Sequence, residues 1–365
     1  MTIYGLSSLA FASRPDIVFV RKLFKYASFV SQVSRFHCGP SYMNSFALAK
    51  TLSCLRIQRI KSNSIATTHK RWQPVTRLSP SRLTQSSRTI TMSSKLIPSN
   101  PANVAVIRDI TPNIATVSAP FARFGIIRVG GRGTIIRLTS GTLAVFSPVA
   151  LTPQTKAKVA DMGGNVGYLI AGDMEHHIFL SEWAAEYPGA KLIGPKELPE
   201  KRAKMNDDKV GKEPFAFVYD ASNKRDNSVS EEFAADFEVA YVDAHANKEL
   251  VLFYKPDRVL IQADLMFNLP AIEQYSKVPE AEKKSHGFIN RFFESCNSTS
   301  GEAKGIKRFL WYAISARDRA GFNESIKVID TWDFNTIIPC HGETIEGNGK
   351  EIFGKVFEWH LKGHK

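Results

Sequence analysis

The chain has 365 residues, a formal net charge of +13 and an isoelectric point near 9.5. The first 100 residues contain fifteen Lys and Arg and one acid, Asp16, so they carry +14 and the rest of the chain carries −1. Proteins that bind a phosphate backbone need a basic surface on the folded domain. Because the excess charge lies in a segment without a regular core pattern, the composition argues against a nucleic-acid-binding protein.

Residues 1–91 have the composition of an organelle transit peptide, being rich in Arg and Ser and nearly free of acids. Helical spacing places Arg21, Lys22 and Lys25 on one side of an amphipathic segment, with apolar residues mostly on the other. We therefore expect a mitochondrial protein. The alternative is that this leader is disordered, or that translation starts at Met92 and gives a cytoplasmic protein. The apolar run 17–20 is far shorter than the ~20 residues of a membrane span, so no membrane partner is expected.

Residues 92–103 are predicted to be a linker, and residues 104–365 to be one globular domain. The domain begins with short strands at 114–118, 124–129, 134–138 and 141–146, joined by Gly-containing turns that are typical of hairpins. A helix then follows from Thr152 to Gly163-Gly164.

The next apolar runs are expected to alternate with a helix over 179–184. They lie at 166–171 and 191–194. Four later runs are predicted to form a second sheet, at 215–219, 237–242, 249–254 and 258–262. A long segment, 271–304, precedes a helix from Ile306 to about Ala320 and a strand at 336–339, and the sequence leaves open whether that segment forms a lid. Two hairpin-rich halves with helices outside them predict an α+β fold, a four-layer αββα sandwich.

Four short segments follow apolar runs and carry potential metal ligands. They read Asp173-Met174-Glu175-His176-His177, Asp243-Ala244-His245, Gln262-Ala263-Asp264-Leu265 and Pro339-Cys340-His341-Gly342. Imidazole nitrogens and carboxylate oxygens are the donors that zinc takes in proteins. Because the side chains that follow neighbouring strands can converge, these segments predict a metal site. Each residue also has a plainer interpretation, as a helix cap, a turn residue or a buried hydrogen-bonded histidine.

In order and spacing these segments resemble the ligand segments of the metallo-β-lactamase superfamily. That family has a His-x-His-x-Asp-His loop, a lone His, an Asp after a strand and a last His before Gly. Here Gly172 and Met174 stand where the first two His belong, and His176 and His177 stand on the Asp and the closing His. The chain therefore resembles a divergent, poorly characterised branch with a degenerate first metal motif.

The resemblance implies that one of the family's two metal sites is lost and one is retained. The retained site would be built by His176, His177, Asp264 and His341, and would hold one divalent ion, zinc or else iron or manganese. His245 and Asp173 would then lie beside the ligands and support them. His176 has a second possible role, as the general base, because its unperturbed pKa is close to neutral pH.

The function that follows is a metal-dependent hydrolase for a small-molecule substrate, an ester, thioester or lactone-like carbonyl compound. The alternative is a catalytically inactive αββα domain that binds a ligand or a protein partner. The sequence predicts neither the substrate nor the oligomeric state. Cys296 and Cys340, the two cysteines after residue 100, have no disulfide-framework spacing and suggest reduced thiols.

Overall fold

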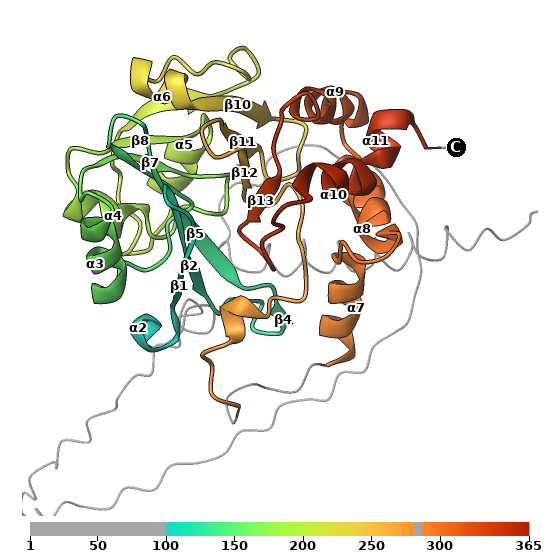
Figure 1. Ribbon diagram of the computed structural model, residues 1–365, viewed down its shortest axis with the longest axis horizontal. Helices are drawn as coiled ribbons and strands as arrows, with labels where there is room; N and C mark the ends of the chain where they lie inside the picture. The colour runs from blue at the N-terminus through green and yellow to red at the C-terminus, as the bar shows by residue number, and fades with distance from the viewer. Residues whose placement is uncertain (1–99, 281–286, 365) are drawn as a thin grey trace, which may run out of the picture. The chain divides into compact units, whose positions relative to one another are not determined.

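The computed structural model describes residues 100–280 and 287–364 (Figure 1). The predicted leader and most of the predicted linker lie outside the described residues, so mitochondrial targeting stays a prediction. The described chain starts with a short helix, α2 (Pro101–Val104). None of the helices within the described ranges is long and apolar enough to span a membrane.

The first sheet has seven strands. In order across the sheet they are β1 (Val106–Thr111), β2 (Ile114–Ala119), β5 (Gly131–Arg137), β6 (Leu143–Phe146), β7 (Val166–Ile170), β8 (Lys191–Pro195) and β9 (Phe215–Tyr219). The first four pair antiparallel, as the Gly-containing turns predicted for the strands from β2 onward, whereas β1 was not predicted. The strands from β6 to β9 run parallel, because helices connect β6 to β7 and β7 to β8.

The second sheet has four strands, β10 (Phe237–Val242), β11 (Glu249–Tyr254), β12 (Val259–Gln262) and β13 (Thr336–Pro339). The first three form antiparallel pairs, and β13 returns after a long helical segment to lie parallel to β12. The sequence analysis placed the run 215–219 in this sheet, and that was wrong. The helix α5 (Leu198–Ala203) carries the chain from β8 to β9, so β9 joins the first sheet instead.

Three apolar layers hold the two sheets and their helices together. Between the sheets, side chains such as Phe146 and Ile170 pack against side chains such as Leu252 and Ile261. On the outer face of the first sheet, helices α3 (Pro153–Asp161) and α4 (Leu180–Glu186) bury Val159 and Trp183. Helices α8, α9 and α10 cover the outer face of the second sheet (Figure 1). The predicted four-layer αββα sandwich is therefore confirmed.

The helices that complete the fold are short. They are α3 (Pro153–Asp161), α4 (Leu180–Glu186), α6 (Glu231–Asp236), α7 (Phe288–Cys296), α8 (Lys304–Phe309), α9 (Arg319–Ile329), α10 (Gly349–Val356) and α11 (Glu358–Lys362). The helix predicted from Thr152 is α3, and the Thr152 hydroxyl caps it by accepting from the Thr155 N–H, with Pro153 at the first helical position. The single helix expected from Ile306 to about Ala320 is instead α8 and a π-helical turn, after which Asp318 caps a new helix, α9.

A small hairpin, β3 (Ala122–Arg123) with β4 (Ile127–Arg128), stands apart from both sheets. The sequence analysis expected one strand over 124–129, but Phe124 and Gly125 have positive φ angles of 55° and 70° and turn the chain there. The base of the hairpin leads into Gly130, and β5 begins at the next residue. This hairpin and the loops after β7, β12 and β13 position the candidate site.

Candidate metal centre

Two of the candidate ligands come from neighbouring parallel strands. In the register of the second sheet, Gln262 at the end of β12 faces Pro339 at the end of β13. Asp264 and His341 each follow two residues later, so they leave the sheet at the same edge. The third candidate, His176, lies in the loop after β7 of the other sheet. The site therefore forms where the two sheets meet.

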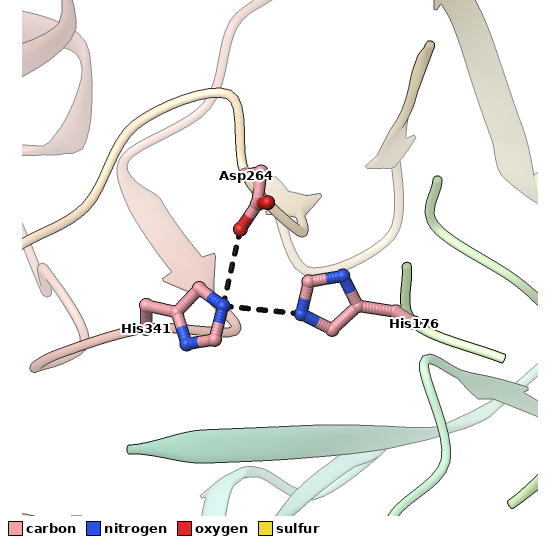
Figure 2. Close-up of side chains that lie close together, drawn as sticks. All are labelled: His176, Asp264 and His341. Atoms are coloured by element: carbon pink, nitrogen blue, oxygen red, sulfur yellow. Dashed lines mark hydrogen bonds and ion pairs between the residues drawn. The ribbon is translucent and has the colours of Figure 1, made fainter. Parts of the chain in front are cut away.

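The side chains of His176, Asp264 and His341 converge, and one potential ligand atom of each lies within 4.8 Å of the others (Figure 2). His341 Nε2 is 3.2 Å from His176 Nε2 and 3.1 Å from Asp264 Oδ1. Asp264 and His341 are buried, and His176 is partly exposed. Two imidazoles and one carboxylate are three donors of the kind that a catalytic zinc site uses.

Asp173 orients His176. Its Oδ1 atom lies 2.9 Å from His176 Nδ1 and also accepts the backbone N–H groups of Glu175 and His176. Asp173 is fully buried, and through these contacts its carboxylate holds the backbone of the loop as well as the His176 ring. A carboxylate on one imidazole nitrogen leaves the other nitrogen directed at a metal, which is the usual arrangement around metal-binding histidines. The geometry thus places Asp173 beside the His176 ring.

His341 is oriented by the backbone. Its Nδ1 lies 2.6 Å from the carbonyl oxygen of Gly130, which can only accept, so Nδ1 carries the proton and Nε2 faces Asp264. The rings of Phe121 and Phe267 flank the imidazole at centroid distances of 6.2 and 4.7 Å. At Gly342, where φ is +85°, a Cβ atom would lie 2.1 Å from the Asn268 carbonyl oxygen. Only glycine fits there.

A buried arginine fixes the loop that carries His341. Arg132 Nη1 donates to the carbonyl oxygens of Pro339 and Gly342, on both sides of His341, at 2.8 and 2.6 Å. Arg132 Nη2 also pairs with Glu273 at 3.1 Å, in the first turn of the segment 271–304. Gln274 Nε2 donates to the Gly342 carbonyl as well. The described start of that segment is therefore packed against the ligand loop.

Asp264 is held at its backbone and at one carboxylate oxygen. Glu249, a buried residue at the start of β11, accepts the backbone N–H groups of Ala263 and Asp264 at 2.6 and 3.0 Å. Asn247 Nδ2 donates to Asp264 Oδ2 at 2.6 Å. The other oxygen, Oδ1, is left for the cluster. Asp264 can thus offer a single oxygen to a metal.

The cluster attracts positive charge. Burial alone would lower the pKa of His176, but the negative charges of Asp173, Asp264 and Glu249 raise it to about 10. Burial acts to raise the pKa of Asp264, yet the charges of His176, His341 and, more weakly, Arg123 lower it well below its usual range. Burial also raises the pKa of Glu249 strongly. Without a metal the cluster therefore keeps a proton on His176, in the position that a cation would take.

His177 lies outside this cluster, although the alignment made it a ligand. Its Nδ1 is 3.3 Å from the buried guanidinium of Arg202, which also donates to the His177 carbonyl oxygen. Burial and the charges of Lys201 and Arg202 lower the pKa of His177 to about 4. The structure thus differs from the prediction, because the turn around Asp173 sends His176 to the centre and His177 toward α5.

Gly172, Met174 and His245, the positions at which the resemblance places the first metal site, have other surroundings. A Cβ atom on Gly172 would lie 2.6 Å from the Phe146 ring and from Ser147 Oγ, and 2.8 Å from Ala263 Cβ. Met174 packs on the outer core of the first sheet. His245 is buried, its Nδ1 accepts the Asn247 N–H, and its Nε2 has no hydrogen-bond partner. His245 is therefore connected to the cluster through Asn247, which donates to both His245 and Asp264.

Sequence reasoning missed three of the residues that support the ligands, namely Asn247, Glu249 and Arg132. A signal existed for Glu249, because it is a charged residue at the head of a strand whose residues are all buried. Arg132 lies beside the recognised Gly130-Gly131 turn, but its distant carbonyl partners gave no local pattern.

No protein-family model and no curated protein matches the sequence. Among solved structures, a metallo-β-lactamase from Pontibacter korlensis aligns over 71% of this chain and 99% of its own, at 9% identity and a TM-score of 0.44. A metallo-β-lactamase from Hirschia baltica aligns over 70% and 97%, at 12% identity and a TM-score of 0.43. A flavodiiron core from Synechocystis aligns over 71% and 62%, at 12% identity and a TM-score of 0.45.

Proposed function

We propose that the protein is a metal-dependent hydrolase with one metal ion, held by His176, Asp264 and His341. The observation that carries the proposal is the convergence of three fixed donors. Asp173 and Gly130 occupy the Nδ1 atoms of the two imidazoles, and Asn247 occupies one oxygen of Asp264. Each ligand thus turns its remaining donor atom to the same point. Such a donor set fits zinc, with iron or manganese as alternatives.

A divalent ion with an open position lowers the pKa of a bound water toward neutrality and polarises a carbonyl oxygen. The protein's own residues prepare the site for this chemistry. Phe121 and Phe267 place apolar rings beside His341 and limit the access of bulk water. His176 acts as a ligand in this proposal and not as the general base, because Asp173 already holds its Nδ1 and its Nε2 faces His341.

The substrate in this proposal is a small molecule with an ester, thioester or lactone-like carbonyl group. A single ion is enough for hydrolysis of such a carbonyl. The alternative remains an inactive αββα domain that binds a ligand or a partner, and the steric closure of the first site at Gly172 is the observation that favours it. Metal binding distinguishes the two functions before any substrate is known.

The deciding measurement is the metal content of the purified full-length protein, dialysed against zinc, iron(II) or manganese(II) and read by elemental analysis. The wild type is expected to retain about one equivalent of one of these metals. The substitutions Asp264→Ala and His341→Ala should abolish retention, while circular dichroism shows that both variants stay folded. Hydrolysis of a panel of aryl esters, thioesters and lactones should follow the metal content.

His364→Ala is the matched control, because it removes an exposed histidine near the C-terminus, away from the cluster. Its metal content should equal that of the wild type. A wild-type protein that stays metal-free in all three dialyses would overturn the hydrolase proposal and favour the binding module.

A further inference from the structure

Arg123 lacks the carboxylate partner that other arginines near the site have. Arg108 and Arg132 pair with Glu273, and Arg202 pairs with Glu213. Arg123 is partly buried in β3 and its backbone carbonyl oxygen accepts the Ile126 N–H, yet within the described ranges its guanidinium makes no ion pair or hydrogen bond. The guanidinium lies over the Phe124 ring, with its carbon 5.8 Å from the ring centroid. A partly desolvated guanidinium without an anion has unused binding capacity.

The hairpin places Arg123 on the side of the metal centre. Its ladder extends to Phe121, whose carbonyl oxygen accepts the N–H groups of Val129 and Gly130. Since side chains alternate along a strand, Phe121 and Arg123 share one face of the hairpin. The Phe121 ring stacks on His341, so that face is turned to the cluster.

The acidic side chains around the metal centre favour a role in substrate binding for the positive charge of Arg123. Asp173 and Asp264 are buried acidic side chains around the centre, so a negatively charged molecule that approaches meets an acidic background. A substrate anion would need a nearby cation to offset it. Within the hairpin, residues 121–130 contain two arginines and no acid. Arg128 is already engaged, stacking over the ring of Tyr275 at 4.8 Å, which leaves Arg123 for a ligand.

We propose that Arg123 is a specificity-determining residue that binds an anionic group of the substrate, a carboxylate or a phosphate, next to the metal centre. This inference rests on the proposed function. It narrows the substrate to an ester, thioester or lactone that carries a negative charge beside its reacting carbonyl. The rings of Phe121 and Phe124 would then contact the apolar part of the same molecule.

The test is a binding measurement on the full-length protein loaded with cobalt(II), whose absorption bands change when a thiol binds. Three probes share a thiol that attaches to the metal. They are 3-mercaptopropionate, its neutral amide 3-mercaptopropionamide, and 2-mercaptoethylphosphonate. The wild type should bind the carboxylate about tenfold more tightly than the amide, because a charge-assisted hydrogen bond replaces a neutral one. The phosphonate shows which anion is preferred.

Arg123→Gln should make the affinities for the carboxylate and the amide equal, and Arg123→Lys should restore part of the preference. Arg128→Gln is the matched control, because it removes the same charge from the opposite strand of the hairpin, and the preference should survive there. If cobalt binds but the wild type has no preference, or if Arg123→Gln keeps it, or if Arg128→Gln also loses it, this inference is wrong and the metal site stands. A protein that binds no cobalt overturns both.

Discussion

Two halves of the candidate centre share the same loops but are built differently. In the first half, formed by His176, Asp264 and His341, each candidate ligand has a partner that fixes its orientation. In the second half, at positions 172, 174 and 245, core atoms fill the space beside Gly172, and His245 Nε2 has no hydrogen-bond partner among the described residues. The difference teaches that a metal site depends on the neighbours of its ligands as well as on the ligands themselves.

The largest effect is expected from an attempt to add a metal ligand to the second half. In Gly172→His the new side chain would enter space occupied by Phe146, Ser147 and Ala263. Overpacking of this kind should lower the free energy of unfolding by about 3 kcal/mol, measured by urea denaturation, and metal content should not rise above one equivalent. Gly189→His, at an exposed glycine with open space around it, should cost little. A second bound metal in Gly172→His would break the comparison.

The next effect concerns the partner of His176. Asp173→Asn keeps the shape of the side chain and removes its charge, so it should weaken metal affinity about 10- to 100-fold, measured by competition with a chromophoric chelator. Asp161→Asn removes an exposed carboxylate that pairs with Lys158 and should leave the affinity unchanged. Equal affinities in the wild type and Asp173→Asn would show that the orienting contact has no role.

The adjacent histidines should show opposite pH dependence in the metal-free protein. The pKa of His176 is raised from 6.5 to about 10, so its contribution is complete below pH 6.5 and is lost as pH rises toward 10. The pKa of His177 is lowered to about 4, so stability falls as pH drops from 6.5 toward 4. Each slope can reach about 1.4 kcal/mol per pH unit.

Unfolding free energies measured in chelator across pH 4 to 10 check this pair. His176→Asn should remove the alkaline loss alone, and His177→Asn the acidic loss alone. If both variants changed the same limb, the assignment of opposite environments to the two residues would fail.

The smallest effect should come from Asn247→Ala. Asp264 Oδ2 would lose one hydrogen bond of 2.6 Å while Glu249 still holds its backbone. The expected loss is about fivefold in metal affinity, or about 1 kcal/mol, by the same competition assay. Asn227→Ala, which removes a bond to the Phe237 carbonyl, is the control. A loss as large as that of Asp173→Asn would show that Asn247 supports more of the site than its single contact suggests.

The sandwich could be predicted from the sequence. The proximity of Asp264 and His341 could also be predicted, because it depends on local patterns. Both follow apolar strands, and strand ends can be read from periodicity. The choice between His176 and His177 could not be read in this way, because it depends on Arg202, which lies twenty-five residues further on in α5. The sheet that β9 joins could not be predicted from local sequence either, because an apolar run of five residues fits either sheet.

The buried guanidinium of Arg132 has a consequence for how an ion would enter and leave. It bridges the carbonyls on both sides of His341 and is anchored in turn by Glu273, so the ligand loop is held in place whether or not a metal ion is bound. The metal site is therefore preformed. The backbones of the metal-bound and metal-free protein should superimpose, in contrast to small zinc domains that unfold when their metal is removed.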